Sequence, residues 1–466
     1  MLFNSLPFLL FFPVCVLLYY VIPDRFKYLW LLFCSYFFYA CQDRSMTVLL
    51  MISTVITWSA GRLVYKAESR SSAHFYLALG FILNLSMLIY FKYSGFIAGL
   101  FLHDENLSLL MPAGISFYTF QSLSYIMDCY RKEVKPENNI LKYALFVSFF
   151  PCILSGPIER SKNMLPQINR VHRWDYIRVK EGLFLMLWGY FLKLVIVSRL
   201  DILTSCVYDN KEAVGIPMLI ALFAYSIRIY CDFAGYSFIA IGAARILDYK
   251  IMRNFRQPYM AVSVADFWRR WHISLSTWFR DYLYIPLGGS RKGTLRRYIN
   301  IIIVFAVSGI WHGATLNFLI WGLLFAAYQV LGYAITPLKD RLKLPKWFCV
   351  AYTYILVCFT WIFFRAESFT AAIDELRRTF TGIRPSQLLD GTVFTLGLGT
   401  MNLAFAAAAI IILIIVDVMC EKRKCEVYQL MDRTKVYIRW AVYYLLFIMI
   451  LFSVNLSTQE FLYQGF

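Results

Sequence analysis

The sequence predicts an all-α integral membrane protein that crosses the bilayer many times. Hydrophobic residues make up 60% of the 466 residues, aromatic residues make up 18%, and the mean hydropathy is +0.59. Soluble domains contain only about 45–50% apolar residues. The apolar residues also gather in runs of roughly 20, the length an α-helix needs to cross about 30 Å of hydrocarbon. We therefore expect one membrane domain over residues 1–466.

The apolar runs give the expected helices in chain order. Runs long enough to cross the bilayer lie near 2–22, 26–41, 46–65, 74–101, 107–130, 181–207, 214–235, 298–311, 314–335, 347–364, 393–419 and 438–456. Two shorter pieces, 141–155 and 236–247, are expected to be re-entrant or interfacial helices. Within the single domain, we expect N-terminal helices over 1–250, a catalytic core over 251–335, and C-terminal helices with an outward-facing tail over 336–466.

The distribution of charge predicts the orientation of the chain in the membrane. Lys and Arg number 46 against 28 Asp and Glu, which gives a net charge of +18. In a soluble protein this excess would suggest nucleic acid, but basic loops beside anionic lipid headgroups explain it here, and no nucleic-acid partner is expected. Basic stretches such as 131–142, 160–180 and 250–297 alternate with loops of little net positive charge. This alternation predicts about 11–12 crossings, cytoplasmic basic loops and both termini outside.

The cysteines and the N-terminal residues bear on disulfides, metal binding and signal cleavage. The eleven cysteines are scattered and form no CxxC pair, so neither a disulfide framework nor a metal site is expected. The first apolar run lacks a basic segment before it and a small-residue cleavage site after it, so we expect a retained span.

Residues 266–321 contain the most unusual pattern in the chain. After Asp266, large apolar residues recur at spacings of three and four and predict one stripe of an amphipathic helix at the cytoplasmic interface: Trp268, Trp271, Leu275, Trp278 and Tyr282. Arg269, His272, Ser276 and Arg280 project from another face. A membrane-surface anchor would have this composition too. It would not explain the following IPLGG break, because freed backbone groups at membrane depth need protein or a watery cavity beside them.

His312 lies within apolar sequence, where an unpaired imidazole is costly. It belongs to the segment SGIWHG and is followed by Asn317. One interpretation is a hydrogen bond to a neighbouring helix. The other is general-base chemistry, because the pKa of imidazole lies near neutrality. His272 and His312 are two of only five histidines. The predicted topology separates them, as the donor and acceptor ends of one transmembrane reaction path.

At these residues the chain resembles the membrane-bound O-acyltransferase superfamily, in the branch of the alginate O-acetyltransferase membrane subunit. The two blocks DFWRRWHISLSTWFRDYLYIPLGG and SGIWHGATLNFLIWG are similar to the signature blocks of that branch. Supporting blocks are MPAGISFYTFQ at 111–121, LSGPIE at 154–159, and DFAGY at 232–236. The resemblance covers nearly the whole chain, in order.

The resemblance implies a ring of tilted helices around a central funnel or tunnel, in a bacterial cytoplasmic membrane. It assigns the invariant histidine of the family to His312 and the second polar position to His272. Trp311, Asn317, Asp232 and Arg245 are expected to line the tunnel or to orient substrates, although Asp232 and Arg245 are also expected to form ion pairs. The implied reaction uses no bound cofactor. An acyl thioester such as acetyl-CoA donates, and a polysaccharide hydroxyl accepts, through an extracytoplasmic SGNH-type partner.

Three alternatives stay open. The same enzyme class could transfer D-alanine from a carrier protein to teichoic acid, or acylate a lipid. A transporter or flippase of lipid or glycan would also need polar residues along a central path, but we find no inverted repeat in the sequence.

The C-terminal residues EFLYQGF resemble aromatic endings whose tyrosine carries an acyl group. Tyr463 is therefore either an acyl relay or part of an interfacial aromatic anchor.

Overall fold

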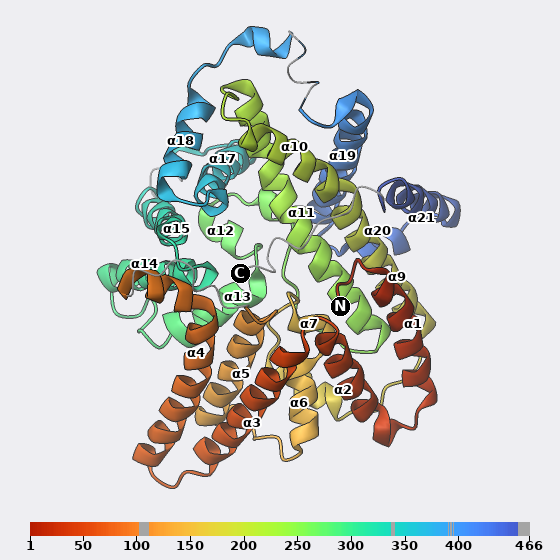
Figure 1. The fold of residues 1–466 in the computed structure, drawn as a ribbon, viewed down its shortest axis with the longest axis vertical. Helices are drawn as coiled ribbons and strands as arrows, with labels where there is room; N and C mark the ends of the chain where they lie inside the picture. The colour runs from red at the N-terminus through yellow and green to blue at the C-terminus, as the bar shows by residue number, and fades with distance from the viewer. Residues whose placement is uncertain (102–110, 337–340, 390, 392–393, 395, 455–466) are drawn as a thin grey trace. The chain divides into compact units, whose positions relative to one another are not determined.

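The computed structural model describes residues 1–101, 111–336, 341–389, 391, 394 and 396–454. The regular elements in these residues are helices, and no β-strand occurs among them, which confirms the predicted all-α class. The helices form two compact units (Figure 1). The first unit contains residues 1–186 and 236–253, and the second contains 187–235 and the described residues of 254–462. Each unit therefore combines segments that are distant in the sequence.

The first unit is built mainly from the N-terminal helices. They are α1 (Leu6–Val21), α2 (Asp24–Ala40), α3 (Arg44–Lys66), α4 (Arg70–Phe101), α5 (Ile115–Tyr130), α6 (Ile140–Ser148), α7 (Phe150–Ile153), α8 (Ser161–Ile168) and the larger part of α9 (Tyr176–Tyr190). Helices α3, α4 and α5 pack against one another, and nearly every residue of α5 is buried (Figure 1). The expected short piece at 141–155 is two short buried helices, α6 and α7, separated at Phe149.

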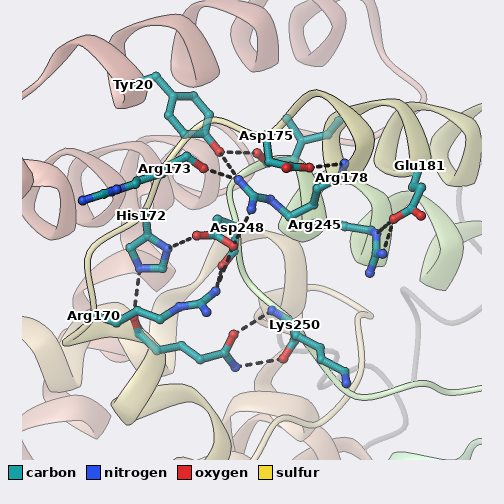
Figure 2. A network of polar contacts seen from close by, with 12 residues as sticks. Tyr20, Arg170, His172, Arg173, Asp175, Arg178, Glu181, Arg245, Asp248 and Lys250 are labelled. Carbon is teal, nitrogen blue, oxygen red and sulfur yellow. Dashed lines mark hydrogen bonds and ion pairs between the residues drawn. The ribbon is translucent and has the colours of Figure 1, made fainter.

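A polar cluster, which we call the Asp248 network, joins two distant segments of this unit (Figure 2). The Asp248 carboxylate accepts from the guanidinium of Arg170 at 2.9 Å and from that of Arg178 at 3.0 Å. Nδ1 of the buried His172 lies 3.3 Å from the same carboxylate, and its Nε2 donates to the carbonyl oxygen of Gln167 at 2.8 Å. Burial lowers the pKa of His172, and Asp248 partly offsets that effect.

The second unit contains the remaining helices. They are η1 (Phe191–Val197), α10 (Ser198–Asp209), the first two thirds of α11 (Ile216–Ile246), η2 (Pro258–Met260), α12 (Val264–Trp268), α13 (Ile273–Phe279), η3 (Arg280–Tyr284), α14 (Thr294–His312), α15 (Leu316–Ala334), α17 (Lys346–Arg365), α18 (Phe369–Phe380), η4 (Pro385–Leu388), α19 (Gly399–Arg423), α20 (Val427–Asp432) and α21 (Val436–Leu451). In this unit α12 packs against α15, and α14 packs against η3 and α15 (Figure 1).

The membrane character of the chain is visible in its helix lengths. Within the described residues, eight helices are long and apolar enough to cross a bilayer, and α1 and α21 are shorter apolar helices. The 11–12 crossings predicted from the sequence also count the runs at 26–41 and 107–130, where the structure has the 17-residue α2 and the 16-residue α5. The chain is a polytopic membrane protein.

The prediction of a separate short helix at 236–247 is wrong. The structure joins this piece to the preceding run in one helix, α11, of 31 residues. Gly235 lies at the junction between the two expected pieces. A Cβ atom on Gly235 would lie 2.9 Å from the carbonyl oxygen of Gly189, so this glycine allows two helices to approach closely.

Candidate functional site

His312 is the last residue of α14, which forms a tight hairpin with α15. Two glycines make the close packing possible. A Cβ on Gly309 would lie 2.3 Å from the carbonyl oxygen of Phe318, and one on Gly322 would lie 2.3 Å from that of Phe305. Both distances are far inside van der Waals contact. The glycines in SGIWHG and in LIWG therefore let the two helix backbones touch.

The His312 side chain is only 2% exposed and lies among aromatic rings. Its ring centroid is 4.8 Å from that of Trp311, 4.9 Å from Trp321 and 5.5 Å from Phe364. We call these three aromatic residues the aromatic cage. The first two rings come from the α14–α15 hairpin and the third from α17. The cage keeps bulk water away from the imidazole, and exclusion of water strengthens the interactions of a reacting group.

His272 does not project from a continuous amphipathic helix, and that prediction is wrong. Residues 266–284 form α12, α13 and η3, separated by a bend at which His272 has the left-handed backbone angles φ 43° and ψ 53°. A residue other than glycine in this region stores strain and needs its surroundings to hold it. The backbone N–H of Ile273 donates to the carbonyl oxygen of Asn254 at 2.9 Å, and the Ser274 hydroxyl donates to the Asn254 side chain at 2.6 Å.

The bend turns the His272 ring into the protein, where it is 1% exposed. Phe233 contacts it edge to face, with ring centroids 4.7 Å apart. Burial lowers the pKa of His272 to about 3, so that the imidazole is neutral at pH 7. His272 therefore supplies hydrogen-bonding atoms and no permanent positive charge.

His272 and His312 both lie beside the indole ring of Trp311. The sequence had predicted that they lie at opposite ends of a transmembrane path. The Trp311 ring centroid lies 6.3 Å from that of His272 and 4.8 Å from that of His312. The expectation of two separate ends followed from the crossing that α14 makes between them. The His272 bend removes this separation, because it turns the imidazole towards the His312 end of α14. The structure thus brings together His272, Trp311 and His312.

Asn317 lies in the first turn of α15 and is completely buried. Its Nδ2 donates to the carbonyl oxygen of Ala366 at 2.7 Å. A carbonyl oxygen only accepts, so this contact fixes which end of the amide is nitrogen. Its Oδ1 is buried without a hydrogen bond to any described residue. Asn317 therefore offers an unused acceptor, Oδ1, to a molecule that enters beside it.

A cavity of about 450 Å³ lies against the hairpin. Along α14 it is lined by Ile301, Val304, Phe305 and Ser308, which share one helix face, and Ser308 is one helical turn before His312. Opposite them, Trp268, Arg269 and Arg280 belong to the lining. The lining mixes apolar side chains with polar ones such as Ser276, Thr277 and Gln329, includes two guanidinium groups, and reaches the turn that precedes His312.

Comparison with known proteins identifies the family of this chain. The model of the MBOAT, membrane-bound O-acyltransferase, family matches residues 131–371, which include His272 and His312. The chain is also 38% identical over 431 residues to the probable alginate O-acetylase AlgI of Pseudomonas aeruginosa, covering 88% of this chain and 81% of that protein. The chain belongs to the membrane-bound O-acyltransferase family. It is an O-acyltransferase, which confirms the resemblance found in the two sequence blocks.

Two further relatives show how widely the acceptor varies among similar proteins. This O-acyltransferase is 34% identical over 417 residues to the peptidoglycan O-acetyltransferase of Helicobacter pylori, covering 81% of this chain and 79% of that protein. It is 27% identical over 330 residues to the teichoic acid D-alanyltransferase of Bacillus subtilis, covering 66% of this chain and 82% of that protein.

Asp232 and Arg245 are ion-paired in this O-acyltransferase. In the second unit, Asp232 accepts from the ammonium group of Lys193, which lies in the π-helical turn η1. In the first unit, Arg245 pairs with Glu181 (Figure 2). Ion pairing is one of the two roles expected for these residues. The predicted acyl relay at Tyr463 lies outside the described residues.

Two buried polar residues near the site, Asp417 and Arg270, were not predicted from the sequence. Asp417, inside the apolar helix α19, accepts a hydrogen bond from the buried Tyr230 hydroxyl at 3.1 Å. Arg270, two residues before His272, donates to both oxygens of Glu421 at 2.7 and 3.2 Å and to Asp266 at 3.0 Å. A carboxylate near the end of an apolar run was the available signal, because such groups in a span need a partner.

Proposed function

We propose that this O-acyltransferase transfers an acetyl group from a thioester, acetyl-CoA, to a hydroxyl group for the acetylation of an extracytoplasmic polysaccharide. The observation that carries this proposal is the cavity that ends one helical turn before His312. Its apolar side chains along α14 suit the uncharged arm of a thioester. Arg269 and Arg280 suit the phosphates of the donor, because guanidinium groups bind phosphate in charge-assisted hydrogen bonds.

His312 acts as the general base in this proposal. Its imidazole takes the proton from the acceptor hydroxyl while the hydroxyl oxygen attacks the thioester carbonyl carbon. The new C–O bond forms, the C–S bond breaks, and the imidazolium returns the proton to the leaving thiolate. An acetyl ester and a free thiol result, so no other reactant is needed. General-base catalysis of this kind contributes about 10²- to 10⁴-fold to a rate.

Asn317 and His272 orient the reacting groups. The Oδ1 of Asn317 accepts a hydrogen bond from a second polar group of the substrate and so directs the attacking hydroxyl, whose own hydrogen goes to His312, at the thioester. The carbonyl oxygen of Ala366 fixes the position of Nδ2, and we assign Asn317 an orienting role. His272, neutral and across Trp311 from His312, is the group that donates to the oxyanion.

The predicted topology completes the proposal. Basic loops in the cytoplasm place the donor there, and both termini lie outside, in a bacterial cytoplasmic membrane. A tunnel among the helices connects the two sides. A secreted transferase of the SGNH type passes the acetyl group to the polysaccharide, and Tyr463 is the residue of this chain that would relay it.

The test uses a deletion strain complemented with wild-type protein, His312→Ala or His312→Gln at matched expression. Ester-linked acetyl groups on the cell-surface polysaccharide are released with mild alkali and measured. We expect both variants to lower them to the level of the deletion strain. Undiminished acetylation in either variant would end the proposal.

D-alanyl transfer is the second candidate, because the chain is similar to a teichoic acid D-alanyltransferase. The lower identity and coverage of that relative favour acetyl transfer. Membrane vesicles supplied with labelled acetyl-CoA in one arm and with a labelled D-alanyl carrier protein in the other decide between them. Label that is transferred only from the carrier protein would replace the proposed donor.

A further inference from the structure

Trp268 separates the cavity from the aromatic cage of His312. Its side chain lines the cavity on one side. On the other, its ring contacts Trp321 with centroids 5.8 Å apart, and Trp321 in turn contacts His312 at 4.9 Å. Phe305 and Phe325 close the remaining space around Trp268, at 5.3 and 5.0 Å. Two indoles therefore stand between the cavity and the imidazole on this side.

This arrangement limits the room beyond a reacting carbonyl. In the proposed donor site, a thioester that lies along α14 has its carbonyl carbon near Ser308, one helical turn from His312, and its acyl group continues beyond the carbonyl carbon towards these rings. Packed aromatic side chains leave no space for added methylene groups, since protein interiors are close-packed. Forcing extra methylenes into such a region shifts side chains and costs free energy.

We propose that Trp268 determines acyl-chain selectivity, accepting an acetyl group and excluding acyl groups of four or more carbons. The inference rests on the proposed function, because it takes the cavity as the donor site. Trp268 then selects the thioester donor by the length of its acyl chain, a role distinct from the proton transfer assigned to His312.

Of the aromatic residues between the cavity and His312, Trp268 is the one whose substitution should disturb the fold least. It is half-buried, and its Nε1 forms no hydrogen bond within the described part of the chain, so its removal leaves no polar partner unsatisfied. Trp321 is 1% exposed and contacts five aromatic rings, so its truncation would damage the cage itself. Trp268→Leu is therefore the informative substitution.

The experiment is a competition between two donors. Membrane vesicles containing the full-length protein and its endogenous acceptor receive equimolar acetyl-CoA and butyryl-CoA, and the ester-linked acyl groups are released and quantified by mass spectrometry. In Trp268→Leu we expect the ratio of butyryl to acetyl transfer to rise at least tenfold, because one or two methylenes in an apolar site alter selectivity by about 10- to 200-fold. Trp188→Leu is the control, since that buried indole stacks on Phe191 and is not one of the lining residues.

The outcomes separate this inference from the proposed function. An unchanged ratio in folded Trp268→Leu, with transfer that still requires His312, would overturn the role of Trp268 alone. Transfer that survives His312→Ala would overturn the proposed function. If Trp268→Leu does not yield folded protein, Trp268→Phe keeps an aromatic ring of smaller size. It should raise the ratio by a smaller factor, and a wild-type ratio in that folded variant would equally contradict the inference.

Discussion

The first unit buries His172 and the second buries His272 and His312, and the surroundings of His172 and His312 differ in kind. In the first unit, His172 lies against Tyr249, and its two nitrogens face the carboxylate of Asp248 and the carbonyl oxygen of Gln167 (Figure 2). In the second unit, His312 lies against aromatic rings beside a cavity. Polar partners on both nitrogens hold an imidazole in place. His312 is instead surrounded by the aromatic cage, one helical turn from the cavity-lining Ser308. Burial alone therefore does not distinguish the two histidines, whereas the kind of neighbour does.

The largest expected effect tests this comparison directly. His312→Gln should reduce acetyl transfer by about 10²- to 10⁴-fold, the usual contribution of a general base, without lowering the thermal stability. His172→Gln should instead lower the free energy of unfolding by about 1–3 kcal/mol, because Asp248 loses a partner. Transfer rates per folded protein and melting temperatures in detergent check both. If His172→Gln lost transfer as completely as His312→Gln at full stability, the comparison would be wrong.

A second prediction concerns the hairpin that positions His312. Gly322→Val adds side-chain atoms where even a Cβ would lie 2.3 Å from the Phe305 carbonyl oxygen. Overpacking of this kind costs about 1–3 kcal/mol, and displacement of a catalytic group by about 1 Å can cost 10²-fold in rate. Gly332→Ala is the matched control in the same helix, since its Cβ would meet no described atom within 4 Å. We expect loss of transfer in the first variant and wild-type transfer in the second. Equal behaviour of the two would contradict the backbone contact.

A third prediction concerns the Asp248 network. Asp248 has φ 67°, a left-handed angle that asparagine also tolerates, so Asp248→Asn changes the charge and leaves the backbone as it is. Loss of the charge shared by Arg170 and Arg178 should lower stability by about 2 kcal/mol with the rate per folded molecule unchanged. Asp432→Asn, at the longer 4.0 Å pair with Arg439, should change stability by less than about 1 kcal/mol. A fall in rate with no fall in stability would assign the network to the reaction.

The last prediction concerns the pH dependence of stability. Burial depresses the pKa of His272 to about 3, below its usual value near 6.5. The unfolded chain therefore binds a proton that the folded chain does not, so the stability is complete above pH 6.5 and declines as the pH falls towards 3. The loss is at most about 1.4 kcal/mol per pH unit. His272→Gln should flatten the decline in melting temperature between pH 6.5 and 4.5. An identical slope in the variant would show that His272 is not buried in its neutral form.

The sequence predicts the helices that are defined by length and apolarity, and it misses what depends on packing. The run at 393–419 corresponds to α19 because about 20 apolar residues in succession have few other solutions. Helix α18 was not expected, because its charges lower the hydropathy of that segment. The stripe of residues after Asp266 fits several short helices as well as one long helix, and only contacts with Asn254 make His272 the point of the bend.

The candidate site was predicted by its residue types and not by its geometry. His312 and Asn317 are recognisable because polar groups are rare in apolar runs. The contact between His272 and Trp311 depends on the backbone bend at His272, which the spacing of residues in the sequence does not predict. The expected re-entrant or interfacial piece at 236–247 failed for a related reason. The lengths of apolar runs do not show whether two neighbouring runs form one helix, and the structure joins them in α11.

The glycine contacts of the α14–α15 hairpin have a consequence for motion during turnover. Two helices whose backbones touch cannot slide past each other without collision, so His312, Asn317 and Trp321 keep fixed positions relative to one another. The segment that packs against the hairpin, residues 264–284, is divided into α12, α13 and η3. The hairpin therefore supplies the rigid half of the site, and His272 comes to it from the divided segment.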